Sequence, residues 1–203
     1  MKKITVETKT LEEAKTSIVE TLRVAENYID FEVTEKKALL GLKRSYTVTG
    51  VVNVDIATYG QQLLETLFEN MEIKATVNIN ENAEEISYQI ETDENPVLIG
   101  KNGKTLEGLQ FYMRNILNIF TEKHVMVLVD IGGYKENRKK QLEILATKTA
   151  KEVARTKISA KLEPMNAYER RIIHTKLSEW RDVSTTSEGN HPKRYLVIKP
   201  KKR

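Results

Sequence analysis

The stretch VLIGKNGKTLEGLQFYM, Val97 to Met113, decides how this 203-residue sequence is interpreted. It contains three glycines and two lysines, and it runs from an apolar edge into an amphipathic helical pattern. Three explanations compete for it: the phosphate-binding loop of an enzyme, a clamp for a nucleic-acid backbone, or a plain turn. The spacing of the glycines and the elements around them separate the three.

Counting excludes both enzymatic loops. A P-loop needs a glycine five residues before its Gly-Lys pair, and Leu98 occupies that position here. A dinucleotide fingerprint needs Gly-x-Gly-x-x-Gly, whereas these glycines are residues 100, 103 and 108. No nucleophile–base pair is evident elsewhere, and His124 and His191 have no second ligand at metal-binding spacing. We therefore expect no enzyme activity, no metal site and no cofactor.

The turn that remains consists of Gly100, Lys101, Asn102 and Gly103. Its glycines can take positive φ at no steric cost and let another backbone approach closely. The helix that follows presents free amides and its positive end to a phosphate, while Lys101 and Lys104 add charge without base selectivity. This is the chemistry of the Gly-x-x-Gly clamp of KH domains, which holds about four nucleotides of single strand.

The elements around this turn have a specific order: helix, strand, strand, short helix, glycine turn, helix, strand. The supporting patterns are a helix after residue 60, strands at 71–79 and 86–90, a helical turn at 96–99, a helix at 105–120 and a strand at 125–131. The last strand is apolar on both faces, so we expect it to be covered on both sides or shared with a partner. The order resembles a type II KH domain, which we place at residues 57–133, after a linker at about 55–60.

Residues 1–56 show a separate β-α-β-β pattern. A strand at 4–6 precedes a helix that starts at a capping box of Thr10 and Glu13, and strands follow near 29–33 and at 46–54. The turn between these two strands is EKKALLGLKRS, which is basic, apolar and contains a glycine. A unit of about 55 residues is small for independent stability.

The last part, residues 134–203, is predicted to contain two helices and two strands. The long first helix is expected to bury Leu142, Leu145, Thr149 and Val153. A capping box of Asn166 and Glu169 starts the second helix, NAYERRIIHTKL. We expect Trp180 to anchor the core, because polar neighbours at the helix end can bond its N–H, and we expect Tyr112 and Tyr168 to be packing residues.

In that second helix Arg170 and His174 are four residues apart and share one face. The spacing Arg-x-x-x-His within NAYERRIIH, between a long basic helix and SEGNHPKRYLVI, resembles the R-three-H domain, a module that binds single-stranded nucleic acid. Arg170 would supply a bidentate phosphate contact, and His174 a donor and a flat ring for a base or sugar. Arg171 is a supporting charge, and Arg194 on the last strand joins the same surface.

The charge of the chain is unevenly distributed. Residues 135–203 hold 19 Lys and Arg against 8 Asp and Glu, whereas the preceding residues hold 14 against 21. A basic module joined to acidic ones favours a polyanionic partner, with nucleic acid first and anionic lipid second. No apolar run has the length of a membrane span or a signal peptide, and the absence of cysteine fits a reducing compartment. We expect a cytoplasmic protein.

A KH-like segment followed directly by an Arg-x-x-x-His segment, with a β-α-β-β unit in front, resembles the bacterial Jag family. That family carries a Lys-Lys-Gly-Phe-Leu-Gly turn in its N-terminal domain, which Lys36, Lys37, Leu40 and Gly41 match, whereas Ala38 and Leu39 depart from it. The resemblance assigns partner binding to the four matching residues. It also implies an α+β protein of three small α/β-sandwich domains in tandem, at residues 1–56, 57–133 and 134–203.

The resemblance further implies single-stranded RNA binding, with single-stranded DNA as an alternative ligand, in an RNA chaperone or post-transcriptional regulator. A small single-KH protein would be its partner, and peptidoglycan homeostasis, cell elongation and cell shape its physiology. The KH segment is also compatible with a homodimer. Two other classes of function remain as alternatives: an enzyme acting on nucleotides, and an adaptor that binds cell-envelope proteins or a membrane surface, with incidental RNA binding.

Overall fold

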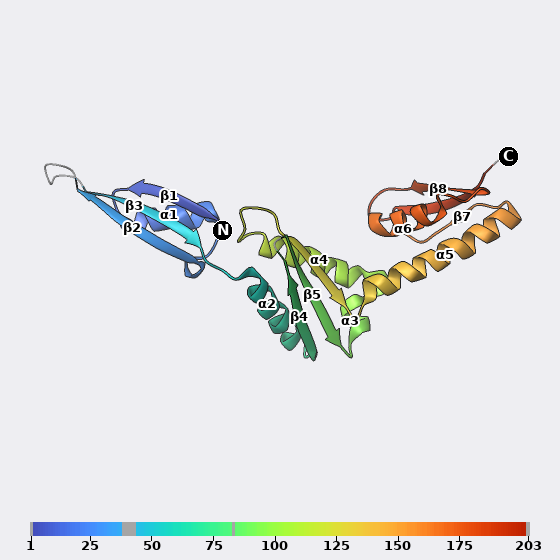
Figure 1. Cartoon of the computed structure of the whole chain (residues 1–203), viewed down its shortest axis with the longest axis horizontal. Coiled ribbons are helices and arrows are strands. Elements are labelled where there is room, and N and C mark those ends of the chain that lie inside the picture. Colours follow the sequence, from blue (N-terminus) through green and yellow to red (C-terminus); the bar gives the residue numbers. More distant parts are fainter. Residues whose placement is uncertain (1, 38–43, 83, 202–203) are drawn as a thin grey trace. The chain divides into compact units, whose positions relative to one another are not determined.

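A computed structural model describes residues 2–37, 44–82 and 84–201 of the chain. The chain divides into two compact units, Met1–Gly132 and Gly133–Arg203. Within the described residues, strands form three separate three-stranded sheets, each accompanied by helices (Figure 1). The protein is therefore α+β and built from small α/β layers in tandem, as the sequence predicts. The division into three domains, at residues 56 and 133, remains a prediction.

The first sheet contains the N-terminal β-α-β-β pattern. The elements of this segment are β1 (Lys3–Thr8), α1 (Leu11–Leu22), the 3₁₀ turn η1 (Glu26–Tyr28), β2 (Ile29–Lys37) and β3 (Arg44–Val52). The strands have the spatial order β1-β3-β2, and both pairs are antiparallel. The Thr10 side chain accepts a hydrogen bond from the Glu13 amide and so caps α1. Gly50 lies directly under α1, because a Cβ at this position would come within 2.4 Å of Ile18 Cγ2.

The second sheet belongs to the segment that carries the glycine turn. The elements are α2 (Ile56–Asn70), β4 (Ala75–Glu81), β5 (Glu85–Thr92), α3 (Asn95–Ile99), the 3₁₀ turn η2 (Lys101–Gly103), α4 (Lys104–Leu117) and β6 (Met126–Ile131). Strand β5 is central, antiparallel to β4 and parallel to β6. The observed element order is the predicted one.

Three details of this segment differ from the prediction. The expected linker at 55–60 is instead the start of α2, whose first amides are capped by the Asp55 carboxylate. Residues 71–74 precede the strand, because Glu72 has φ 59° and the Ile73 amide bonds back to Phe68 O. Strand β6 is buried on one face alone: Val127 and Val129 are covered, whereas Met126 is 55% exposed.

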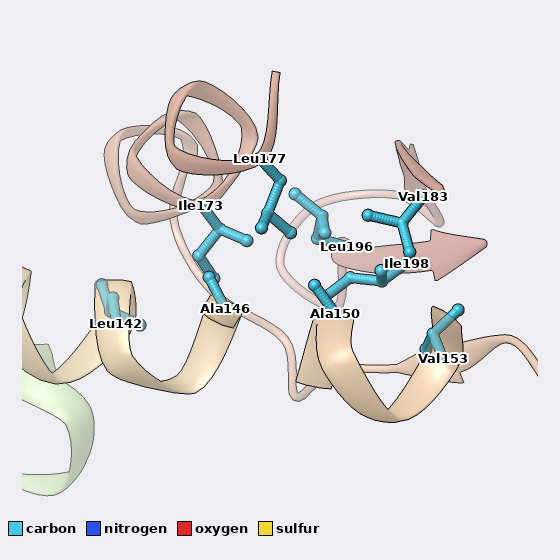
Figure 2. Packing of buried hydrophobic residues seen from close by; sticks show 9 residues of the cluster. All are labelled: Leu142, Ala146, Ala150, Val153, Ile173, Leu177, Val183, Leu196 and Ile198. Carbon is cyan, nitrogen blue, oxygen red and sulfur yellow. The ribbon is translucent and has the colours of Figure 1, made fainter. Parts of the chain in front are cut away.

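The second unit packs two helices against its sheet. It consists of α5 (Tyr134–Thr156), β7 (Ala160–Lys161), α6 (Ala167–Leu177), β8 (Val183–Glu188) and β9 (Tyr195–Pro200), with the sheet order β7-β9-β8. Figure 2 shows its core, in which Ala146 and Ala150 of α5 lie among the larger side chains of α6, β8 and β9. The predicted α5 face was partly wrong, since Leu145 is 40% exposed and the two alanines are buried instead. Alanine lets the helices pack closely.

Candidate nucleic-acid interface

The glycine turn adopts a conformation that requires glycine. Gly100 ends α3 with φ 68° and ψ 179°, and Gly103 starts α4 with φ 75°. Asn102 between them also has positive φ, at 54°, which asparagine tolerates better than most residues. A Cβ at Gly100 would lie 2.1 Å from Thr105 Oγ1. The turn is thus folded tightly onto the first turn of α4.

The polar groups of this turn can receive an anion. Gly103 is the N-cap of α4 and has no side chain that could accept a hydrogen bond from the first amides of this helix. The positive end of the helix dipole therefore lies at this turn. Lys101 and Lys104 are both exposed on either side of Gly103, which is itself buried. Glycines, lysines and helix end therefore lie together, as the sequence predicts, and they offer close approach and positive charge to a phosphate.

The second set of predicted residues lies on α6, where Arg170 and His174 both reach β8. Arg170 Nη1 donates a hydrogen bond to Ser187 Oγ at 3.0 Å, and His174 Nδ1 is hydrogen-bonded to Thr185 Oγ1. The His174 side chain remains exposed. The two hydroxyl partners were missed by sequence reasoning, although Val183, Thr185 and Ser187 alternate along one face of the strand. They hold the arginine and the imidazole side by side.

The start of α6 is fixed by a single buried carboxylate. Glu169 is 6% exposed, and with Asn166 it makes a complete capping box. The same carboxylate pairs with Arg138 of α5, whose Nε lies 2.7 Å from Glu169 Oε1. A buried carboxylate needs such partners to remain charged. This ion pair therefore orients the helix that carries Arg170 and His174.

Arg194 and Arg171, the other two predicted contacts, are placed differently. The Arg194 backbone is tied to the site, because its carbonyl accepts from the Met165 amide at 3.1 Å and Met165 O accepts from Arg170 Nε at 3.4 Å. Arg171 lines a groove between α5 and α6 instead, together with Trp180. Arg171, predicted as a supporting charge, therefore points away from Arg170, since consecutive helical residues point about 100° apart.

The predictions for aromatic side chains have mixed outcomes. Trp180 packs against the core of the second unit, as predicted. Tyr112 and Tyr168 were wrongly predicted to be packing residues, because they are 43% and 65% exposed. Of the predicted partner-binding residues, Lys36 and Lys37 end β2, and Lys36 Nζ lies 3.9 Å from a Glu7 carboxylate oxygen. Leu40 and Gly41 lie outside the described residues.

The described residues also bear on metal binding and on membrane insertion. In that part of the chain, no group of three or more His, Cys, Asp or Glu residues is arranged to hold a metal ion. None of the described helices combines the length and the apolar character needed to cross a membrane.

A KH-like segment with a glycine turn, followed by a two-helix module with an Arg-x-x-x-His face, defines a class of nucleic-acid-binding architecture. Residues 140–200 match the R-three-H domain family. The chain is 35% identical to the RNA-binding protein KhpB of Clostridium symbiosum, over all of this chain and 93% of that protein. It is 32% identical to RNA-binding protein KhpB of Bacillus subtilis (strain 168), over the full length of both.

A third relative, RNA-binding protein KhpB of Streptococcus pneumoniae serotype 2, is 34% identical over 70% of this chain and 44% of its own length. The first two matches, which cover all of this chain and nearly all of each relative, show the family. The chain belongs to the KhpB family, also called the Jag family.

Proposed function

We propose that this protein binds single-stranded RNA without catalysing a reaction, in the cytoplasm. The observation that carries the proposal is the glycine turn, in which Gly100 and Gly103 bring backbone without side chains to the start of α4, beside two exposed lysines. Relatives named RNA-binding proteins and the R-three-H match support it. Single-stranded DNA offers the same phosphate chemistry and is the alternative ligand.

The proposed RNA binding uses two sites in one chain. The glycine turn and the Arg170–His174 face would each hold a short stretch of strand, and linked sites bind one strand more tightly than either does alone. Such an arrangement suits an RNA chaperone or a post-transcriptional regulator. We place its physiology in peptidoglycan homeostasis, cell elongation and cell shape, in agreement with the family resemblance.

The proposed protein partner is a small single-KH protein that docks on α4 and the start of β6. Large apolar side chains are exposed there: Phe111 at 61%, Tyr112 at 43%, Ile119 at 42% and Met126 at 55%. Phe111 and Tyr112 lie on α4, and Ile119 follows just beyond the end of this helix at Leu117. Exposed apolar side chains grouped along one stretch of the chain favour a protein interface. The same surface would serve a homodimer.

A second candidate function is an adaptor of cell-envelope proteins, for which RNA is incidental. The exposed apolar residues of α4 favour it equally, because they do not specify their partner. Crosslinking in cells, with identification of both bound RNA and bound protein, separates the two candidates. Enriched RNA supports the first proposal, whereas strong recovery of envelope proteins without enriched RNA supports the second.

Binding of a single-stranded RNA at several salt concentrations tests the clamp. Lys101→Gln/Lys104→Gln removes two phosphate contacts, so the slope of log affinity against log salt should fall by about 1.4. Lys3→Gln/Lys123→Gln removes two exposed lysines elsewhere in the first unit and should leave the slope unchanged. Gly103→Asp should weaken binding further, since it puts a carboxylate where phosphate approaches. Parental affinity in a folded Gly103→Asp variant would disprove the clamp.

A further inference from the structure

Helix α6 has a second polar side, which faces α5 rather than β8. Between the two helices lies a groove of about 860 Å³, and its lining includes Lys139, Tyr168, Arg171, Thr175 and Trp180. The contacts that hold Arg170 and His174 are made to β8 instead. The groove is therefore a different surface from the Arg-x-x-x-His face, although both belong to the same helix.

The groove is basic, and its two best-placed cations are not neutralised. Among the described residues, neither Lys139 nor Arg171 has a salt-bridge partner, whereas Lys176 Nζ lies 3.6 Å from Glu143 Oε2. Glu179 also lines the groove. A smaller hollow of about 550 Å³ along α5 shares Glu143 and Lys176 with it and adds Lys140, Lys148 and Lys151. Across both, six cations and two carboxylates form the lining, and one of the cations, Lys140, is also paired at 3.7 Å with Glu136.

Aromatic surface accompanies this charge. The Tyr168 ring is 65% exposed in the first turn of α6, without a role in the core. Trp180 is half-buried, packing with one side on the core and lining the groove with the other. Flat aromatic faces beside Lys and Arg are the combination that binds single strands, because bases stack while phosphates meet cations. An acidic peptide would use the charges but not the rings.

We propose that the α5–α6 groove is a second single-strand binding surface of the R-three-H domain, which takes bases against Tyr168 and Trp180 and phosphates on Lys139 and Arg171. This proposal rests on the RNA binding proposed above and deepens it, since it adds a strand path along α5. A strand that fills both sides of α6 would be longer than one that contacts Arg170 and His174 alone. Affinity should therefore rise with strand length beyond the reach of the clamp and the Arg-x-x-x-His face.

Trp180 provides a direct measurement, because it is the one tryptophan of the chain. Single-stranded RNA of increasing length is titrated into the full-length protein, and tryptophan fluorescence is followed beside an independent binding signal from labelled RNA. We expect RNA to quench Trp180. In Lys139→Gln/Arg171→Gln the quenching should disappear at RNA concentrations that saturate the parent, and the salt slope should fall by about 1.4. Arg155→Gln, an exposed charge on α5 outside both hollows, is the matched control and should behave as the parent.

The outcomes distinguish this inference from the proposed function. If labelled RNA binds and the glycine-turn variants weaken it, but Trp180 is silent and Lys139→Gln/Arg171→Gln keeps the parental slope, the groove proposal is wrong and RNA binding stands. If labelled RNA does not bind the parent at all, the proposed function fails first. If poly-glutamate quenches Trp180 and RNA does not, the groove takes an acidic protein segment, which overturns the proposal as well.

Discussion

Arg170 and Ser187 join helix α6 to strand β8 through a hydrogen bond of 3.0 Å between the guanidinium Nη1 and the serine Oγ. The bond fixes the guanidinium plane, and His174 is held one turn further along by Thr185. Pre-oriented groups lose less conformational freedom when they bind a ligand. The hydroxyls of β8 are therefore as much a part of the proposed RNA site as the two residues that name its motif.

This arrangement predicts different effects for two substitutions. Arg170→Gln removes a charge, so RNA affinity should fall and the salt slope should decrease by about 0.7. Ser187→Ala keeps the charge of Arg170 but removes the hydrogen bond that orients its guanidinium, so RNA affinity should fall while the salt slope stays unchanged. Binding isotherms at three salt concentrations measure both. Equal slopes for Arg170→Gln and the parent would show that Arg170 contacts no phosphate.

The apolar surface of α4 predicts a separation of partner binding from RNA binding. Phe111→Asp/Ile119→Asp changes two exposed side chains, so the melting temperature should change little. Association with a small KH protein, or self-association, should be lost, as measured by light scattering after gel filtration. Glu122→Gln/Lys123→Gln, exposed residues beyond the end of α4, is the control. Unchanged association of the double aspartate variant would place the interface elsewhere.

A packed pair in the first unit predicts coupled stability effects. The Tyr88 hydroxyl donates to Ala57 O at 3.0 Å, and burial raises the pKa of Tyr88, so the hydroxyl stays protonated. A Cβ at Gly60 would lie 2.1 Å from that oxygen. Gly60→Ala should cost about 1–3 kcal/mol of unfolding free energy, and Tyr88→Phe about 1–2 kcal/mol. In urea denaturation the double variant should lose less than the sum, because the clashing oxygen is gone.

The cap of α2 predicts a dependence on pH. The Asp55 carboxylate accepts hydrogen bonds from the Thr58 hydroxyl and from the Thr58 and Ala57 amides, and these bonds, the hydroxyl first, lower the pKa of Asp55. The pKa of Asp55 is therefore lower in the folded protein than in the unfolded chain, where it is about 3.9. At pH values above the unfolded pKa the ionised carboxylate stabilises the folded state, and this contribution is lost as the pH falls through the folded pKa.

Asp55→Ala should therefore cost about 1 kcal/mol at pH 7, and the difference from the parent should shrink at pH 3. Asp55→Asn keeps a capping oxygen that does not titrate, so it is the matched control. Urea denaturation at the two pH values measures the difference. A penalty for Asp55→Ala that is as large at pH 3 as at pH 7 would contradict the assignment of the cap.

The sequence predicted the elements whose patterns are local, and it failed where distant packing decides. The order of helices and strands, the N-caps of Thr10 and Asn166 and the glycine turn follow from spacing alone. The buried face of α5 does not follow from spacing, because Ala146 and Ala150 are buried by their packing against side chains of α6. Likewise the sequence marks Arg171 only as a supporting charge beside Arg170, and their different surroundings exist only once β8 and α5 lie on either side of α6.

The ion pair between Arg138 and Glu169 decides where the R-three-H domain can be cut. The segment that matches the family model starts at residue 140, two residues after the arginine. A fragment with these limits would keep the buried Glu169 carboxylate and discard the cation that stabilises it. Loss of one partner from a buried pair typically costs about 3–5 kcal/mol. A piece cut from residue 134 onward retains the whole of α5 and is the one to express for work on this domain by itself.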